Sequence, residues 1–244
     1  MKGEVFLVGA GPGDPNLLTL KAYDLIQKGD IILYDRLVSQ EILDLIPNHV
    51  ETIYVGKDHY FQEEINQLML QLVKKGKKVI RLKSGDPFIF GRGSEEVQFF
   101  KNHNISYYII PGISSITGIP SSVGIPLTHR TLSSSIIVLT GTEDPLKEQE
   151  QIDWRNVAKV AHTIVILMGV GKFPTIIDQL LSCGKDPNTP VAIIEWGTTS
   201  KEKLTIEKLS NIKVIAKQKR IQAPSLILIG KVVSLHKDYK MEDK

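Results

Sequence analysis

Apolar runs of strand length alternate with amphipathic stretches from one end of the chain to the other. Residues 5–9 form the first run, and a Gly/Pro loop separates them from a stretch in which Ala22, Leu25 and Ile26 recur at helical spacing. Asp14, directly before a proline, is a residue type that caps a helix start, so we place the cap of this first helix there. Such alternation is typical of a mostly parallel sheet covered by helices, and the pattern predicts an α/β fold.

The same pattern predicts further elements along the rest of the chain. In the first half we expect strands over residues 31–34, 50–55, 77–82 and 107–110, and helices over residues 39–46, 63–75 and 95–103. In the second half we expect strands over residues 136–140, 163–168, 191–195 and 226–229, and a helix over residues 175–182. The Lys-rich segment 201–219 fits neither pattern clearly, and residues 237–244 are expected to be a frayed tail.

The stretch of residues 113–130 is rich in Ser, Gly and Pro and has no clean period. A length of 244 residues suits two domains of just over 100 residues each. We therefore predict an N-terminal α/β domain over residues 1–112 and a C-terminal α/β domain over residues 113–244.

Composition excludes several classes of protein. A chain with 23% charged and 42% hydrophobic residues is an ordinary globular protein, not a disordered or fibrous one. Thirty basic against 27 acidic residues give a net charge of +3, too little for a dedicated nucleic-acid binder. No apolar run approaches the ~18 residues of a membrane helix, so we expect neither export nor anchoring. The single Cys183 excludes an intrachain disulfide and a Cys-rich metal site, and it favours a reducing cytoplasm.

The loop of residues 9–15 is the first glycine-rich segment at the end of a predicted strand, where open α/β sheets bind ligands. It departs from the dinucleotide fingerprint, because Asp14 stands where that fingerprint requires glycine and Pro12 stiffens the turn. A P-loop is absent too, since neither residues 56–58 nor residues 171–173 supply its spacing. By itself, the loop is equally well explained as a tight strand-to-helix turn.

Asp35 directly follows the second predicted strand, so we expect its carboxylate at the carboxyl end of the sheet, beside the first loop. A catalytic carboxylate is one interpretation of this position. The others are a helix cap, a surface partner for Arg36, and the ribose-binding acid of a nucleotide fold.

Residues 81–96 form the segment richest in loop-forming and charged residues. It contains three glycines, one proline, two phenylalanines and six charged residues. We expect it to be a functional loop. Asp86 is suited to accept hydrogen bonds from ribose hydroxyls or from loop amides. Arg92 precedes a predicted helix that carries Glu95 and Glu96, and its alternative role is an exposed pair with one of them, worth under ~1 kcal/mol.

Weaker candidates follow the later strands. They are residues 111–115, residues 124–130, Met168-Gly169 and residues 195–198. Each has a structural explanation as well: His129 as a hydrogen-bonding residue, Met168 as part of the core, and Cys183 as a small buried hydrophobe.

Taken together, these segments resemble the tetrapyrrole methylases over nearly all of the chain. The segments that carry the resemblance are residues 8–14, 17–21, 34–38, 55–57, 62–66, 81–96, 111–113 and 124–130. Residues 34–38 and 124–130 resemble most closely the branch of the family that methylates uroporphyrinogen III. Bifunctional sirohaem synthases resemble the chain as well, but we expect no room here for their dehydrogenase and chelatase portion.

The resemblance implies two α/β domains with mostly parallel sheets, an active-site cleft between them, and a homodimer. It implies S-adenosyl-L-methionine (SAM) as methyl donor, leaving as S-adenosyl-L-homocysteine, and no metal. The reaction it implies is the double methylation of uroporphyrinogen III to precorrin-2, at the start of the sirohaem and cobalamin branch.

Residue roles also follow from the resemblance. The family's proposed base falls on Asp35 and its proposed proton donor on Lys57. The matching SAM-binding positions are Pro12, Ser84, Gly85, Asp86, Ile89, Ser114, Ser115, Met168 and Gly197, and we expect Arg92, Glu95 and Arg130 to face the substrate. Departures from the family pattern are local: Ser84 replaces a usual glycine, and Ser114-Ser115 replace a common Thr-Ala.

The implied chemistry needs little from the protein beyond alignment and control of a proton. A pyrrole carbon is already nucleophilic, and near-attack geometry lowers such barriers by up to ~7–11 kcal/mol. We expect Asp35 to lie in a partly dry cleft, where burial raises the pKa of a carboxyl group toward a useful range. Two alternatives remain open from the residues alone: a nicotinamide-dependent oxidoreductase and a non-catalytic tetrapyrrole carrier.

Overall fold

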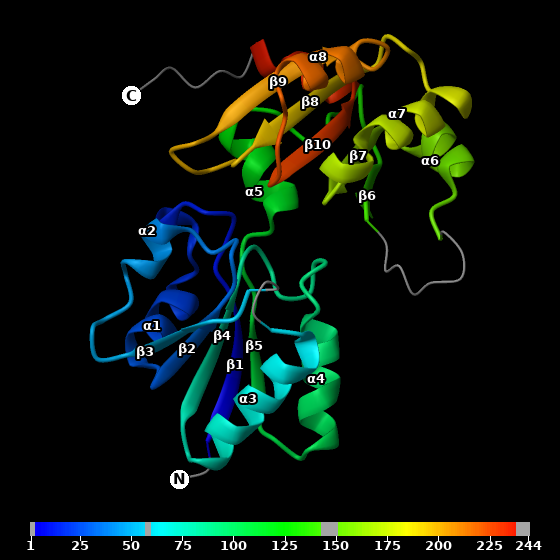
Figure 1. The fold of residues 1–244 in the computed structure, drawn as a ribbon. Helices are drawn as coiled ribbons and strands as arrows, with labels where there is room; N and C mark the ends of the chain where they lie inside the picture. Colours follow the sequence, from blue (N-terminus) through cyan, green and yellow to red (C-terminus); the bar gives the residue numbers. More distant parts are fainter. Residues whose placement is uncertain (1–2, 57–59, 143–150, 238–244) are drawn as a thin grey trace. The chain divides into compact units, whose positions relative to one another are not determined.

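The computed structural model describes residues 3–56, 60–142 and 151–237 (Figure 1). The chain divides into two compact units, Met1–Ser115 and Ile116–Lys244. Each unit contains one five-stranded sheet with helices, so the predicted α/β class with two sheets is confirmed.

The first unit is built on an all-parallel sheet of strand order β3-β2-β4-β1-β5. Its strands are β1 (Glu4–Gly9), β2 (Ile31–Tyr34), β3 (Glu51–Tyr54), β4 (Lys78–Lys83) and β5 (Tyr107–Ile110). Its helices are η1 (Pro15–Leu17), α1 (Leu20–Lys28), α2 (Gln40–Leu43), α3 (Gln62–Lys74) and α4 (Gly93–Asn102). Every strand that the pattern predicts in this half is present within one or two residues of its expected ends.

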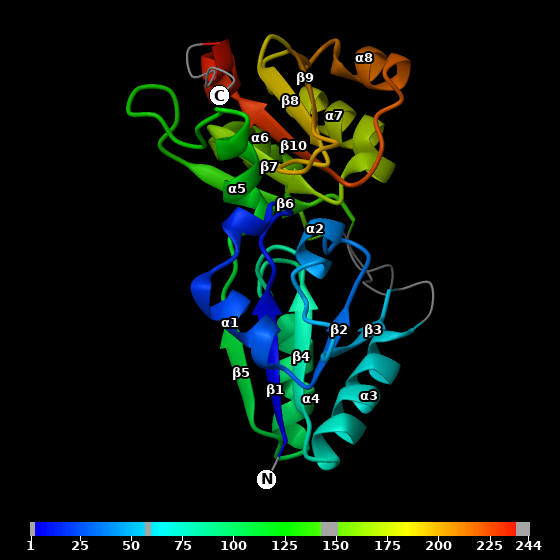
Figure 2. The ribbon, with the colours of Figure 1, turned by 90° about the vertical axis from the view of Figure 1, so that its left-hand side faces the viewer.

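Helices cover both faces of the first sheet, with α1 on one face and α3 and α4 on the other (Figure 2). Side chains along β4 point alternately to the two faces of the sheet. Ile80 and Leu82 pack in the cluster that contains the buried residues of α1. Val79 packs in the opposite cluster, together with Met69 of α3 and Phe100 of α4. A central parallel strand is thus enclosed on both sides.

The second unit contains a sheet of strand order β6-β7-β10-β8-β9. Its strands are β6 (Ile136–Thr140), β7 (Thr163–Leu167), β8 (Pro190–Glu195), β9 (Lys203–Lys208) and β10 (Ser225–Gly230). Its helices are α5 (Ser115–Ser122, beginning at the last residue of the first unit), α6 (Trp154–Val160), η2 (Val170–Lys172), α7 (Phe173–Ser182), α8 (Ile212–Gln218) and η3 (Lys231–Lys237).

Strand direction in this second sheet corrects the expectation of mostly parallel pairing. Strands β6 and β7 are parallel, whereas β7 with β10, β10 with β8, and β8 with β9 are antiparallel. The seven residues between β8 and β9 are too few for the helical crossover that parallel neighbours need. The parallel pattern therefore holds for the first sheet only.

Among the described residues, three α-helices and one strand fall where the pattern predicted nothing definite. Helix α5 occupies the Ser/Gly/Pro stretch and contains Pro120, α6 precedes β7, and the Lys-rich segment holds β9 and α8. Ser, Gly and Pro are poor helix formers, so α5 depends on tertiary packing, with Ile119 and Pro120 buried.

The first helix begins later than expected. Asp14 caps the short 3-10 helix η1 by accepting from the amide of Asn16, and Thr19 caps α1 by accepting from Ala22. At the other end of the chain, Lys237 closes η3, and residues 238–244 of the expected tail lie outside the described residues. Among the residues that are described, no helix has the length and apolar character needed to cross a membrane.

Candidate active site

Three loops at the carboxyl edge of the first sheet meet backbone to backbone. Gly11 and Gly85, which follow β1 and β4, exchange two hydrogen bonds of 3.2 and 2.7 Å. Gly112, after β5, lies so close that a Cβ on it would stand 2.2 Å from the carbonyl oxygen of Gly85 and 2.8 Å from Cα of Gly9. Gly11 (φ 73°) and Gly85 (φ 68°) also adopt left-handed conformations that favour glycine. The glycines of the sequence motifs are therefore required by this close packing of loops.

Asp86 holds two of these loops together. Its Oδ1 accepts from the amide of Phe88 (2.8 Å) and its Oδ2 from the amide of Gly112 (3.1 Å). Ribose hydroxyls and loop amides were the two hydrogen-bond donors predicted for Asp86, and the structure shows loop amides. Ser114 and Ser115 follow Gly112 and lie beside Gly85, with the Ser115 amide 3.6 Å from the position of a Cβ on that glycine.

The loop after β4 exposes apolar side chains at the same edge. Phe88, Ile89 and Phe90 are all exposed, and Phe90 has a positive φ of 51°. Pro12, in the first loop, is buried instead. Exposed apolar groups beside tightly packed glycine loops suit a ligand that is part ring and part polar chain.

Asp35 lies at the carboxyl end of β2, where the sequence predicted it. Its Oδ2 is 3.2 Å from Nη2 of Arg81, and its Oδ1 accepts from the amide of Leu37 at 3.3 Å. The side chain is 30% exposed. Its charged partner is therefore the buried Arg81 and not the neighbouring Arg36, and one side of the carboxylate remains open to solvent.

Arg81 belongs to a buried charge network that the sequence pattern did not predict. Nε of Arg81 (3.3 Å) and Nζ of Lys83 (3.0 Å) both contact Oε1 of Glu96, a fully buried side chain on α4. Burial lowers the pKa of the Lys83 ammonium from its ordinary 10.5, Arg81 lowers it further, and the charge and hydrogen bond of Glu96 oppose both effects. The sequence carries one sign of this network, because Arg81 and Lys83 alternate with apolar residues in a strand that the pattern places inside the sheet.

Arg92 is the N-cap residue of α4 and has a left-handed backbone (φ 57°). Its side chain is exposed, as is that of Glu95 one turn further on. Glu96 is committed to Arg81 and Lys83, so it is not the partner of Arg92. Within the described ranges no acidic side chain pairs with Arg92, and a strained residue with a free guanidinium beside the loops is consistent with ligand binding.

Two predicted residues of the second unit share one edge of its sheet. Met168 follows β7 and Gly197 follows β8, and these strands run in the same direction because both are antiparallel to β10. Met168 is 48% exposed and has a φ of 55°, so it is not the core residue of the alternative interpretation. Gly197 packs on Ile119, whose Cγ2 would stand 2.4 Å from an added Cβ.

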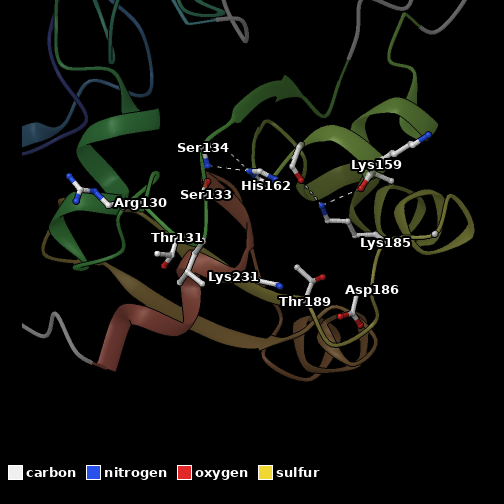
Figure 3. Close-up of a pocket in the computed structure, with 14 residues that line it drawn as sticks. Arg130, Thr131, Ser133, Ser134, Lys159, His162, Lys185, Asp186, Thr189 and Lys231 are labelled. Carbon is white, nitrogen blue, oxygen red and sulfur yellow. Dashed lines mark hydrogen bonds between the residues drawn. The ribbon is translucent and has the colours of Figure 1, made fainter.

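Arg130 lies elsewhere in the second unit. It lines a cavity of about 450 Å³ together with Ser134, His162, Lys185 and Lys231 (Figure 3). His162 directly precedes β7 and Met168 directly follows it, so this cavity is at the opposite end of the strand, roughly 16–20 Å from Met168. The structure therefore does not bring Arg130 together with Met168.

Lys185 and His162, two of the side chains that line this cavity, have structural partners. Nζ of Lys185 donates to the carbonyls of Ala158 and Ala161 at the end of α6, and burial lowers its pKa. Nδ1 of His162 accepts from the amide of Ser134. His129 has a structural role as well, since its Nδ1 accepts from the amide of Thr131.

Lys57, the candidate proton donor, lies outside the described residues. In the part of the chain that is described, no group of three or more His, Cys, Asp or Glu side chains is placed to hold a metal ion. Cys183 is half-buried at the end of α7, where it packs against the core.

Comparisons with known protein sequences identify the family of the chain. A family model described as Tetrapyrrole (Corrin/Porphyrin) Methylases matches residues 4–213. The chain is 46% identical over 238 residues to an S-adenosyl-L-methionine-dependent uroporphyrinogen III methyltransferase of Methanosarcina barkeri, covering 96% of this chain and 93% of that protein. It is 45% identical to a sirohaem synthase of Pseudoalteromonas translucida, covering 97% of this chain but about half, 50%, of that longer protein.

Solved structures show the same similarity. Uroporphyrin-III C-methyltransferase from Thermus thermophilus, complexed with S-adenosyl homocysteine, superposes with a TM-score of 0.82 at 41% identity, covering 95% of this chain and 99% of that one. A cobalt precorrin-4 methyltransferase of cobalamin biosynthesis superposes with a TM-score of 0.85 at 25% identity, covering 94% of this chain and 95% of that one.

Proposed function

Because the chain belongs to the tetrapyrrole (corrin/porphyrin) methylase family, we propose that it is a SAM-dependent C-methyltransferase that methylates uroporphyrinogen III twice to give precorrin-2. The observation that carries this proposal is the 46% identity, across nearly the full length of both chains, to a methyltransferase of that activity. The reaction is the first step of the sirohaem and cobalamin branch.

The loops described above form the proposed SAM site of the first unit. Residues of the first unit proposed to hold it are Pro12, Ser84, Gly85, Asp86, Ile89, Ser114 and Ser115, and those of the second unit are Met168 and Gly197. Close-packed glycines bring three loops together at one edge of the first sheet, and the exposed Ile89 offers an apolar contact for a purine ring. Asp86 contributes by fixing two loops through their amides. When bound, SAM supplies an electrophilic methyl group on a sulfonium sulfur.

Asp35 is the proposed base. A pyrrole carbon that gains a methyl group becomes cationic, and a proton must leave to restore the neutral ring. The carboxylate of Asp35 is held by Arg81 and the Leu37 amide and keeps an open side that a substrate proton can approach. Lys57 stays the proposed proton donor on the strength of the resemblance alone.

Arg92, Glu95 and Arg130 are the proposed substrate contacts. Guanidinium groups bind carboxylates bidentately, and the substrate carries an acetate and a propionate on every ring. Arg92 is exposed and lacks an acidic partner in the described chain, so it is available for such a carboxylate. Arg130 lies at the other end of β7 from Met168, so its contact would be with a carboxylate remote from the transferred methyl group.

The proposed setting is a homodimer in a reducing cytoplasm, without a metal and without nucleic-acid or membrane partners. The single Cys183 favours the reducing compartment, and the net charge of +3 disfavours nucleic acid.

Transfer of a labelled methyl group from SAM to uroporphyrinogen III under anaerobic conditions tests the function directly. Two methyl groups per macrocycle are expected, with unchanged SAM binding by calorimetry after exhaustive chelation. Binding of NAD or NADP without SAM would favour the oxidoreductase alternative. Tetrapyrrole binding without methyl transfer would favour the carrier.

A further inference from the structure

Two cations are buried in the middle of the first sheet. Arg81 and Lys83 alternate with Ile80 and Leu82 along β4, so both point to the face covered by α3 and α4. Each side chain is only 4% exposed. Strand β4 lies between β2 and β1, so neither cation can reach solvent at a sheet edge.

Glu96 is the anion that these two cations share. It is fully buried in the first turns of α4, and its Oε1 accepts from Arg81 Nε (3.3 Å), Lys83 Nζ (3.0 Å) and Gln62 Nε2 of α3 (3.2 Å). Its Oε2 has no hydrogen-bond partner in the described part of the chain. One carboxylate oxygen therefore holds two like charges side by side.

The guanidinium of Arg81 connects the buried carboxylate of Glu96 to the partly exposed carboxylate of Asp35. On one side Nε contacts Glu96, on the other Nη2 contacts Asp35, and Nη1 donates to the carbonyls of Leu33 and Leu82. A guanidinium is planar and rigid, so fixing Nε also fixes the direction of Nη2. The position of the Asp35 carboxylate thus depends on an anion that substrate does not reach.

We propose that Glu96 is a positioning residue for methyl transfer, acting through Arg81 to hold the Asp35 carboxylate at the carboxyl edge of the sheet. The inference rests on the proposed function, in which Asp35 is the base. Packing alone does not require this network, because buried ion pairs can often be replaced by apolar side chains without loss of stability. The network balances two cations, Arg81 and Lys83, against the carboxylates of Glu96 and Asp35. Asp35 is the one member of this network that is open to solvent, so the three buried members can orient it.

Glu96→Gln is the test variant. The amide keeps the shape and one accepting oxygen, and its NH₂ group takes the place of Oε2, where no described donor lies. Without the negative charge, Arg81 and Lys83 repel each other with no anion between them, and the neutral amide oxygen holds the guanidinium more weakly than the carboxylate does. We expect kcat to fall on the order of 10- to 100-fold, with KM for both substrates and SAM affinity changed less than about 3-fold.

A double-mutant cycle with Asp35→Asn separates positioning from general damage. If Glu96 acts through Asp35, Glu96→Gln should change the single-turnover rate less than about 2-fold in the Asp35→Asn background. Phe100→Leu, a buried change one turn along α4, is the control for lost stability. An equal loss of rate in both backgrounds, or the same fall in kcat for a Phe100→Leu protein of matched stability, would overturn the proposal.

The crystal structure of Glu96→Gln gives a readout that is independent of activity. We expect the contact between Arg81 Nη2 and Asp35 Oδ2 to be lost, and an unchanged contact would overturn the proposal.

Should Glu96→Gln not fold, Glu96→Gln/Lys83→Met removes one charge of each sign, and kcat should still be low. Full activity of Asp35→Asn would reject the base itself and this inference with it, whereas a low Asp35→Asn rate with normal Glu96→Gln kinetics would reject this inference alone.

Discussion

The backbone amide of Gly112 donates a hydrogen bond to Oδ2 of Asp86 over 3.1 Å. This bond joins the loop after β5 to the loop after β4, although 26 residues separate the two partners. It is possible because Gly112 has no side chain, since its α-carbon lies against the Gly85 carbonyl and the α-carbon of Gly9. The proposed SAM loops therefore act as one packed unit at the carboxyl edge of the sheet.

We expect Gly112→Ala to disrupt this unit. The added methyl would stand 2.2 Å from the Gly85 carbonyl oxygen, which is backbone and cannot rotate away. Overpacking of this kind typically lowers the free energy of unfolding by ~1–3 kcal/mol, and SAM affinity should fall with it. Denaturant unfolding and calorimetry with SAM provide the measurement. Gly171→Ala is the matched control, because nothing lies within 4 Å of its added Cβ; equal behaviour of the two variants would contradict the prediction.

Asp35→Asn should leave the fold and SAM affinity near those of the unmodified protein, because the amide keeps the shape of the carboxylate. Turnover should fall by ~10²–10⁴, the usual effect of losing a positioned general base. Rates are measured at saturating substrate between about pH 6 and 9. Unchanged turnover across that range would show that Asp35 is a structural or ribose-binding residue.

Arg92→Ala should weaken binding of the macrocycle at least ~30-fold. Removing one guanidinium from a desolvated charge pair costs ~2–5 kcal/mol, whereas an exposed surface pair contributes at most ~1 kcal/mol. Fluorescence quenching under anaerobic conditions, which keep the substrate reduced, measures the affinity, and SAM affinity should stay the same. A loss of less than about 5-fold would assign Arg92 to the surface.

The same measurement on Arg130→Ala asks whether the cavity of Figure 3 belongs to substrate binding. We expect a loss of at least ~30-fold here too, because a remote carboxylate of the macrocycle is proposed to pair with this arginine. Equal affinity in the unmodified protein and in Arg130→Ala would show that the cavity lies outside the substrate site.

Burial of Lys83 should make stability depend on pH in the alkaline range. Because its pKa in the folded protein is lowered from 10.5, mainly by burial, the unfolded chain holds the proton where the folded protein has released it. Stability should therefore rise with pH between the lowered value and 10.5, by up to about 1.4 kcal/mol per pH unit for this one proton. The free energy of unfolding, measured with denaturant at several pH values, should rise less with pH in Lys83→Met than in the unmodified protein. An equal rise with pH in the two proteins would contradict the prediction.

The sequence by itself determined the strands of the first unit, the strands of the second unit other than β9, and the strand ends where chemistry is placed. Period-two and period-3.6 patterns are local, so residues 31–34, 107–110 and 136–140 could be assigned without knowledge of the fold. Asp35 and the glycines of the 81–96 segment could be placed at the carboxyl edge, because every strand of a parallel sheet presents that end to one side. The family followed from ordered motifs spread over nearly the whole chain.

Strand direction in the second sheet was decided by the tertiary structure alone. Strand β9 lies in the Lys-rich segment that the pattern left unassigned, so its antiparallel pairing with β8 across a seven-residue connection could not be predicted. Helix α5 was missed for a related reason, because its stability comes from the burial of Ile119 and Pro120 and not from helix-forming residues.

Tertiary structure also decided which charges meet. Arg81 contacts Asp35, 46 positions away, and Glu96, 15 positions away, and neither spacing has meaning within a single helix or strand. The sequence showed two cations in a central strand, but their partners depend on which helix covers that face and at what height. An electrostatic interaction depends on distance in space, and only the packing of α4 on β4 brings the Glu96 carboxylate to within 3.3 Å of both cations.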